Sequence, residues 1–387
     1  MFVTRERLEE IEAQTLAPYA LLSKNSQGRV YPEPEPAYRT AFQRDRDRVL
    51  HSAAFRRLEY KTQVFVNDLG DYYRTRLTHT LEVSQIGRTM ARGLGVNEDL
   101  VEVICLAHDL GHPPFGHAGE MVLNQLLTEH GGFNHNRQSF RVVTELERRY
   151  PDWPGLNLTH ETLEGIAKHE TEYDVSETAG FDPDLQGSLE AQIADVADEL
   201  AYNAHDLDDG LQSGLITTDQ LNGLEIWREL CDRLDWHGGP IDEITRHRFI
   251  REQIGMQVTD ILGATMARIQ ALEPQSPEEI QRHPIHIVGH SETLQRYNRE
   301  LKRFLYENMY YHYTVMRMSK RAERFIEELF ASFVAEPRQL PRQYQAMIKD
   351  NPIELVVADY IASLTDRSAV REYQGLVDPF WRANPLD

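Results

Sequence analysis

The chain has 387 residues, of which 41% are apolar, so it can bury one large core or two smaller ones. Its formal net charge of −21 disfavours extended contact with nucleic acid, membranes and other polyanions except where basic residues gather. Two cysteines, no apolar run of the roughly 18 residues that span a bilayer, and a start without a signal-peptide pattern predict a soluble cytoplasmic protein without disulfides. Apolar residues recur with the helical period and strand-like alternation is scarce, which predicts an all-α fold.

The first 38 residues are predicted to form a helix and then a proline-rich arm. Three prolines in YPEPEPAY, residues 31–38, exclude helix and indicate an extended connector that lies on another surface. Arginines gather just beyond this arm, which is compatible with a local anion site in an otherwise acidic protein. The cluster consists of Arg39, Arg44, Arg46, Arg48, Arg56 and Arg57, followed by Lys61, Arg74 and Arg76.

A block from about residue 40 to residue 215 is dense in His, Asp and Arg. Apolar periodicity predicts helices near residues 76–94, 97–110, 118–130, 136–149, 159–170 and 188–211, with a loop over residues 171–187. Later helices are expected over residues 291–333 and, finally, after Asp350 as N-cap and Pro352 in the first turn. We therefore divide the chain into an N-terminal segment (1–38), a chemical core (39–222) and a C-terminal helical region (223–387).

The helix predicted over residues 76–94 has a histidine on its buried face. His79 shares that face with Val83, Ile86 and Met90, at helical spacing. A lone histidine in this position is more often a core residue bonded to a carbonyl than a ligand. Other segments of this chain supply further ligand types, which favours the second interpretation.

The next predicted helix ends in a His-Asp pair, His108 and Asp109, just before Gly111 and two prolines. Neighbouring helical side chains point about 100° apart, so both reach one ion only near a helix end that faces a cleft. Imidazole and carboxylate ligands suit Mn, Fe, Co, Ni or Zn, and the lack of nearby cysteine argues against a structural zinc site.

The helix predicted over residues 188–211 has an acidic stripe that offers a further ligand. Such a stripe is usually a solvated face, but histidines in two other segments favour a metal site with a ligand from this stripe. The stripe comprises Asp195, Asp198, Tyr202, Asp206 and Asp209. The opposite, apolar face is expected to pack on the core and comprises Ile193, Val196, Leu200, Ala204, Leu207 and Leu211.

Long motifs in order resemble the HD phosphohydrolase superfamily and, within it, the bacterial deoxyguanosine triphosphatase-like proteins. They run from HSAAFRRLEYKTQVF (residues 51–65) through RLTHTLEV, AHDLGHPPFGHAGE, FNHNRQSFR and ADELAYNAHDLDDGL to DYIASLTDR (residues 359–367). The resemblance implies an HD-domain helical core with additional C-terminal helices that complete the substrate pocket and an oligomer interface. It also implies metal-dependent hydrolysis of a deoxynucleoside triphosphate (dNTP) to a deoxynucleoside and inorganic triphosphate.

The resemblance also implies roles for single residues. The metal ligands are His79, His108, Asp109 and Asp198. Asp198 is preferred to Asp195 because the family places its ligand four residues before the tyrosine that matches Tyr202. The ion would be divalent, with Mn or Mg favoured over Ni, Co, Fe or Zn. The catalytic set is His117, Glu120, His112 and His135, in which His117, oriented by Glu120, delivers the water or proton at the α-phosphate.

A substrate-binding set is implied as well: Arg57, Gln63, Val64, Arg76, Tyr202, Asp206, Lys302 and Tyr310. Within it, Gln63 would bond the 3′-hydroxyl and Val64 would occupy the space of a 2′-hydroxyl. Arg76 and Lys302 would bind phosphate, and Tyr310 would stack on the sugar.

The expected partners are the dNTP itself and further copies of the chain, as a hexamer or tetramer, with an activating dNTP at a subunit boundary. One alternative is an HD nucleotidase or phosphodiesterase, although the Arg-rich KTQVF region favours a triphosphate. Another is an idle nucleotide sensor or binder of single-stranded nucleic acid, which the net charge disfavours.

Overall fold

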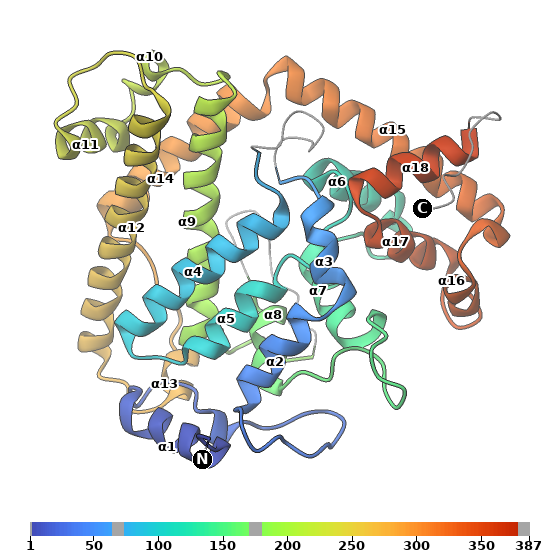
Figure 1. The fold of residues 1–387 in the computed structure, drawn as a ribbon, viewed down its shortest axis with the longest axis horizontal. Coiled ribbons are helices and arrows are strands. Elements are labelled where there is room, and N and C mark those ends of the chain that lie inside the picture. Colours follow the sequence, from blue (N-terminus) through green and yellow to red (C-terminus); the bar gives the residue numbers. More distant parts are fainter. Residues whose placement is uncertain (1, 64–72, 170–179, 378–387) are drawn as a thin grey trace.

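The structure is a computed structural model that describes residues 2–63, 73–169 and 180–377. Its described part contains helices and isolated β-bridges but no sheet, so the predicted all-α fold is confirmed (Figure 1). The first helices are α1 (Arg5–Thr15), α2 (Ala41–Leu50), α3 (Ala53–Arg57), α4 (Arg76–Leu94), α5 (Glu98–Ala107), α6 (Gly116–Leu126), α7 (His135–Arg141), α8 (His160–Ala167) and α9 (Leu189–Gln212). They are followed by α10 (Thr218–Leu221), α11 (Glu225–Leu234), α12 (Glu243–Leu272), α13 (Pro277–Gln281), α14 (Glu292–Leu305), α15 (Tyr313–Ala335), α16 (Arg342–Met347), α17 (Ile353–Ser363) and α18 (Asp366–Val377).

Helix α9 lies at the centre of the molecule. Helices α4 and α5 pack against it from one side, and α12 and α14 pack against it from another (Figure 1). Its apolar residues from Ile193 to Leu207 are buried as predicted, but Asp195, Asp206 and Asp209 on the opposite face are buried too. The interpretation of this stripe as a solvated acidic face is therefore wrong.

Helices α4 and α5 form an antiparallel pair that positions the first two ligand segments. Thr75 caps the start of α4 with a capping box, and Gly95 ends it in the left-handed conformation, after which Asn97 caps α5. The helices approach closely at Gly87, where an added Cβ would lie 2.9 Å from the Val101 side chain. The start of α4 therefore lies beside the end of α5, as His79 and His108 require.

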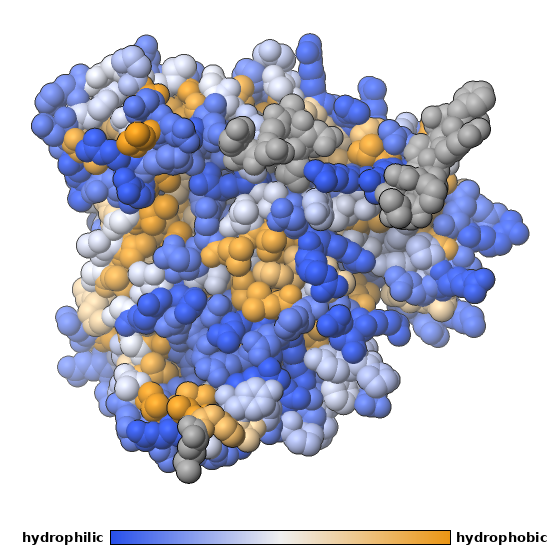
Figure 2. Space-filling view, viewed as in Figure 1, coloured by the Kyte–Doolittle hydropathy of each residue, from blue (hydrophilic) through white to orange (hydrophobic). Residues whose placement is uncertain are grey.

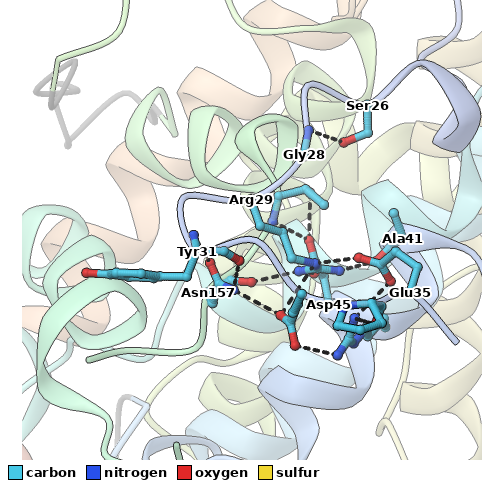
Figure 3. A network of polar contacts seen from close by, with 12 residues as sticks. Ser26, Gly28, Arg29, Tyr31, Glu35, Ala41, Asp45 and Asn157 are labelled. Carbon is cyan, nitrogen blue, oxygen red and sulfur yellow. Dashed lines mark hydrogen bonds and ion pairs between the residues drawn. The ribbon is translucent and has the colours of Figure 1, made fainter. Parts of the chain in front are cut away.

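The proline-rich arm contains no helix, as predicted, and a buried ion network holds it against α2 (Figure 3). Arg29 pairs with Glu35 and Asp45, and its guanidinium also donates to the backbone carbonyl of Asn157. Four arginines of the predicted cluster serve similar pairs: Arg39 with Asp47, Arg44 with Glu33, Arg46 with Asp99, and Arg48 with Glu33. The expectation of an anion site at these four arginines is therefore wrong, because carboxylates of the same chain already neutralise them.

The C-terminal helices depart from prediction in two places. The helix expected over residues 291–333 is interrupted, because a π-helical turn, Tyr306–Tyr310, separates α14 from α15. The helix after Asp350 has Pro352 itself as N-cap and is not the last, since α18 follows. Helix α15 packs on α6, α17 and α18 around a second apolar cluster, beside the loop that precedes α6. The division at residues 38 and 222 stays a prediction.

Figure 2 shows a mostly hydrophilic face with apolar side chains gathered near its middle. Among the described helices, none is long and apolar enough to cross a membrane.

Glu190, in the first turn of α9, provides a test of how a buried carboxyl affects stability. It accepts hydrogen bonds from the backbone N–H groups of Leu21 and Asn97, and burial raises its pKa from 4.5 to about 7. Its stabilising contribution is therefore complete below pH 4.5 and is lost as the pH rises through 7. Wild type should therefore lose stability between pH 5 and pH 8, whereas Glu190→Gln cannot titrate at this position. We expect the free energy of unfolding of Glu190→Gln, relative to that of wild type, to be about 1–3 kcal/mol more favourable at pH 8 than at pH 5, measured by urea unfolding. An equal effect of the substitution at both pH values would contradict this.

Candidate metal and active site

Three helices bring the four predicted metal ligands together. His79 lies in the first turns of α4, and His108 and Asp109 follow α5 directly. Ligand atoms of these three buried residues all lie within 4.8 Å of one another. From α9, Asp198 places Oδ1 at 2.9 Å from His79 Nε2 and at 3.7 Å from His108 Nε2. The arrangement is a compact pocket of two imidazoles and two carboxylates.

The state of His108 shows that these residues fit a cation. Its Nδ1 donates to the Cys105 carbonyl at 2.6 Å, and burial lowers its pKa, so the ring is neutral with a lone pair on Nε2. That Nε2 atom is buried and has no hydrogen-bond partner among the described residues. A buried lone pair that faces the carboxylates of Asp109 and Asp198 is stabilised by a positive ion between them.

Arg76 neutralises one of the two carboxylates. Its Nη1 lies 2.9 Å from both oxygens of Asp109. Burial would raise the pKa of Asp109, but the charge of Arg76 outweighs burial and holds the pKa well below its usual range. Nε and Nη2 of Arg76 are buried without a partner among the described residues, so they can donate to a further acceptor. The predicted phosphate-binding arginine thus contacts a metal ligand and keeps two unused donor atoms.

Sequence reasoning missed His169, which follows α8 at the edge of this cluster. Its Nδ1 lies 2.5 Å from Asp195 Oδ1, and its Nε2 lies 3.7 Å from Asp198 Oδ2. Burial lowers the pKa of His169, but Asp195 and Asp198 outweigh burial and raise it to about 10. The signal was a histidine at a buried helix end before a polar loop, as at His108. These contacts also distinguish the two aspartates, because Asp195 bonds His169 whereas Asp198 bonds His79.

The predicted catalytic residues adjoin Asp109. His112 Nε2 lies 3.3 Å from Asp109 Oδ1, and the His112 ring stacks on that of His135 with centroids 3.8 Å apart. Both oxygens of Glu120 accept from His135 Nδ1, at 2.9 and 3.0 Å. His117 is exposed, with its ring 5.6 Å from that of His112. Glu120 thus orients His135, whereas its predicted partnership with His117 stays a prediction.

Three predicted substrate residues meet, two of them on α9 beyond Asp198. The hydroxyl groups of Tyr202 and Tyr310 contact each other, their rings are parallel with centroids 6.4 Å apart, and the Tyr310 hydroxyl donates to Asp206. Burial raises the pKa of Asp206 to about 8. Lys302 pairs with Glu199 of α9 at 2.7 Å.

The remaining predicted contacts divide into three cases. Gln63 is buried, and its Oε1 has no partner among the described residues. Val64 lies outside the described residues. Arg57 lines a cavity of about 50 Å³ with Lys61, Tyr344 and others, and the described lining contains none of the four predicted metal ligands. The role of Arg57 in substrate binding stays a prediction.

Comparison with known proteins covers nearly the whole chain. Residues 76–203 match the HD domain, and residues 288–375 match the phosphohydrolase-associated domain. A deoxyguanosinetriphosphate triphosphohydrolase-like protein of Geobacter sulfurreducens is 50% identical over 98% of this chain and 100% of its own. Proteins of the same description from Geobacter metallireducens and Nitrosomonas europaea are each 51% identical, over 96% and 93% of this chain and 97% of their own.

The chain belongs to this deoxyguanosinetriphosphate triphosphohydrolase-like family. It is an HD-domain phosphohydrolase. The HD match contains His79, His108, Asp109 and Asp198, together with the loop before α6. The phosphohydrolase-associated match contains Lys302, Tyr310 and the motif at residues 359–367.

The buried pair of Arg76 and Asp109 can be tested by its effect on stability. Arg76→Met keeps the length of the side chain but leaves the Asp109 charge without its partner, so we expect a loss of about 3–5 kcal/mol in metal-free protein. A divalent ion would supply the missing positive charge, and saturating Mn²⁺ should therefore reduce the loss. Urea unfolding of both proteins with EDTA and with Mn²⁺ measures the two differences. A loss that is unchanged by Mn²⁺ would contradict a cation at Asp109.

Proposed function

We propose that this phosphohydrolase cleaves dNTPs to a deoxynucleoside and inorganic triphosphate, with a divalent ion, Mn or Mg, held by His79, His108, Asp109 and Asp198. The observation that carries the proposal is the partnerless Nε2 of His108, which faces two carboxylates beside an arginine with unused donors. The names of relatives about half identical over nearly the full chain support the substrate class. We also propose a homo-oligomer activated by a second dNTP.

The reaction joins a water oxygen to the α-phosphorus and breaks the bond to the 5′-oxygen, which takes up a proton. A bound ion would supply positive charge at the phosphate and acidify a water molecule. The unused donors of Arg76 would bind a phosphate oxygen and stabilise the charge that develops there. His117 is exposed at the start of α6 and would exchange the proton, because an imidazole ring can both accept and donate a proton. Tyr310 and Asp206 would hold the sugar.

The decisive experiment incubates purified protein with Mn²⁺ or Mg²⁺ and each dNTP and NTP, singly and in pairs, and separates the products by ion-exchange chromatography. We expect triphosphate and deoxynucleoside, with kcat/KM for a dNTP roughly tenfold to a hundredfold above that for its NTP. His108→Ala should lose both metal and activity, whereas His130→Ala, which removes a surface histidine paired with Glu354, should lose neither. Release of orthophosphate or a nucleoside monophosphate would instead identify a nucleotidase or phosphodiesterase.

The proposed role of His117 can be tested by measuring metal and substrate binding separately from turnover. We expect His117→Ala to retain stoichiometric metal and an unchanged KM but to lose kcat by about 10²-fold or more, as removal of a general acid or base does. Elemental analysis and steady-state kinetics measure the two effects. Loss of metal, or normal turnover, would show that His117 has another role.

A further inference from the structure

The C-terminal motif DYIASLTDR, residues 359–367, has no role in the proposed chemistry, yet it borders the catalytic segments. It spans the end of α17 and the start of α18, which lie beside α6 and α7 (Figure 1). Two of its residues, Asp359 and Asp366, are buried carboxylates. Burial of a carboxylate is costly unless donors satisfy it, so the donors show what each one holds.

Asp366 joins two segments that carry proposed site residues. Its Oδ1 accepts from the Phe115 backbone N–H at 2.9 Å. Its Oδ2 accepts from the Thr62 backbone N–H at 2.9 Å and from the Thr62 hydroxyl. Thr62 precedes Gln63, and Phe115 lies between His112 and His117. One carboxylate thus ties the loop before α6 to the segment that carries the proposed sugar-binding glutamine.

Two more contacts of the motif reach the same region. Asp359 accepts from Arg141 at 2.6 and 2.9 Å and from Gln138 at 2.9 Å, which fixes α7, the helix that begins with His135. The Ala362 carbonyl accepts from Lys61 Nζ at 2.9 Å, and Lys61 also donates to the His112 carbonyl.

The backbone of the loop explains why it needs such support. Phe115 has φ 65°, a left-handed conformation that is unfavourable for a residue with a Cβ and persists only where the surroundings hold it. The bond from Phe115 N–H to Asp366 is made at this residue. Gly116 follows with φ 58°, and an added Cβ there would lie 3.3 Å from Arg76 Nη2. The loop therefore passes close to the unused Nη2 of Arg76 at a position that has no side chain.

We propose that Asp366 is a positioning residue: it holds Phe115 and Thr62 so that His117 and Gln63 stand at the places the reaction requires. It does so from the C-terminal helices, without contact to the proposed metal ligands. The catalytic part of this inference rests on the proposed hydrolysis. The structural part, that Asp366 fixes residues 112–117, does not.

Asp366→Asn tests the proposal against a closely matched control, Asp45→Asn. Asp45 is also buried, and its Oδ2 accepts from the backbone N–H and hydroxyl of one threonine, Thr159, at 2.8 and 2.6 Å. It lies in the ion network of the N-terminal arm and not beside the loop before α6 (Figure 3). In each variant an amide NH₂ replaces an acceptor oxygen, so both should lower the melting temperature.

Only Asp366→Asn should alter the loop. We expect amide hydrogen exchange over residues 112–117 to accelerate at least tenfold in Asp366→Asn and to stay at the wild-type rate in Asp45→Asn. We expect kcat to fall tenfold or more in Asp366→Asn, with wild-type metal content, at a temperature where both variants are folded. Thr62→Val removes the hydroxyl bond alone, and it should show a smaller effect of the same kind if Asp366→Asn does not fold.

The readouts distinguish the two proposals. Faster amide exchange in Asp366→Asn would support the positioning role even if the wild-type protein does not hydrolyse dNTPs. The absence of hydrolysis by wild type would by itself overturn the proposed function. Unchanged exchange and kcat in Asp366→Asn, with dNTP hydrolysis by wild type, would overturn the positioning role. Equal changes in both variants would overturn it as well, because they would reflect general destabilisation.

Discussion

Two carboxylates, Asp109 and Asp198, place negative charge inside a helical core, and the remainder of the site compensates for it. An uncompensated charge in such an interior costs about 3–5 kcal/mol, which is a large share of the net stability of a typical domain. Arg76 compensates Asp109, while His79 and His169 compensate Asp198. His108 contributes a neutral nitrogen instead of a positive charge. The cluster therefore compensates most of this charge with its own residues, and one small cation between the two carboxylates would complete the compensation.

The same principle separates two groups of arginines that look alike in the sequence. Arg44 and Arg48 meet carboxylates of the N-terminal arm and fix that arm in place. Arg76 has one buried carboxylate for its Nη1 and nothing described for Nε and Nη2. Arg76 thus has two buried donor atoms without a described partner beside the proposed metal ligands, and the local abundance of positive charge in the sequence was a poor guide to it.

Much of the site could be predicted because it follows from helical periodicity and residue type. His79 was predicted from its place on the apolar face of α4, and His108 and Asp109 were predicted from the break in the helical pattern after α5. Contacts between distant segments could not be predicted in this way. The pairing of Glu120 with His135 depends on how α6 meets α7, and His169 depends on the packing of α8 against α9. The π-helical turn between α14 and α15 leaves no clear break in the apolar pattern, so a single helix was expected there.

The close approach of α4 and α5 at Gly87 has a consequence for ion selectivity. The gap between His79 and His108 is set by how far apart the two helix axes lie, and a Cβ at position 87 would press on Val101 and Cys105 at 2.9 and 3.0 Å. His79 is about two helical turns from Gly87, so a methyl group at position 87 would increase the distance between the His79 and His108 side chains. A larger distance between these two side chains would suit an ion of larger radius. The radius of the ion that the proposed site would accept is thus sensitive to packing changes that leave every proposed ligand in place.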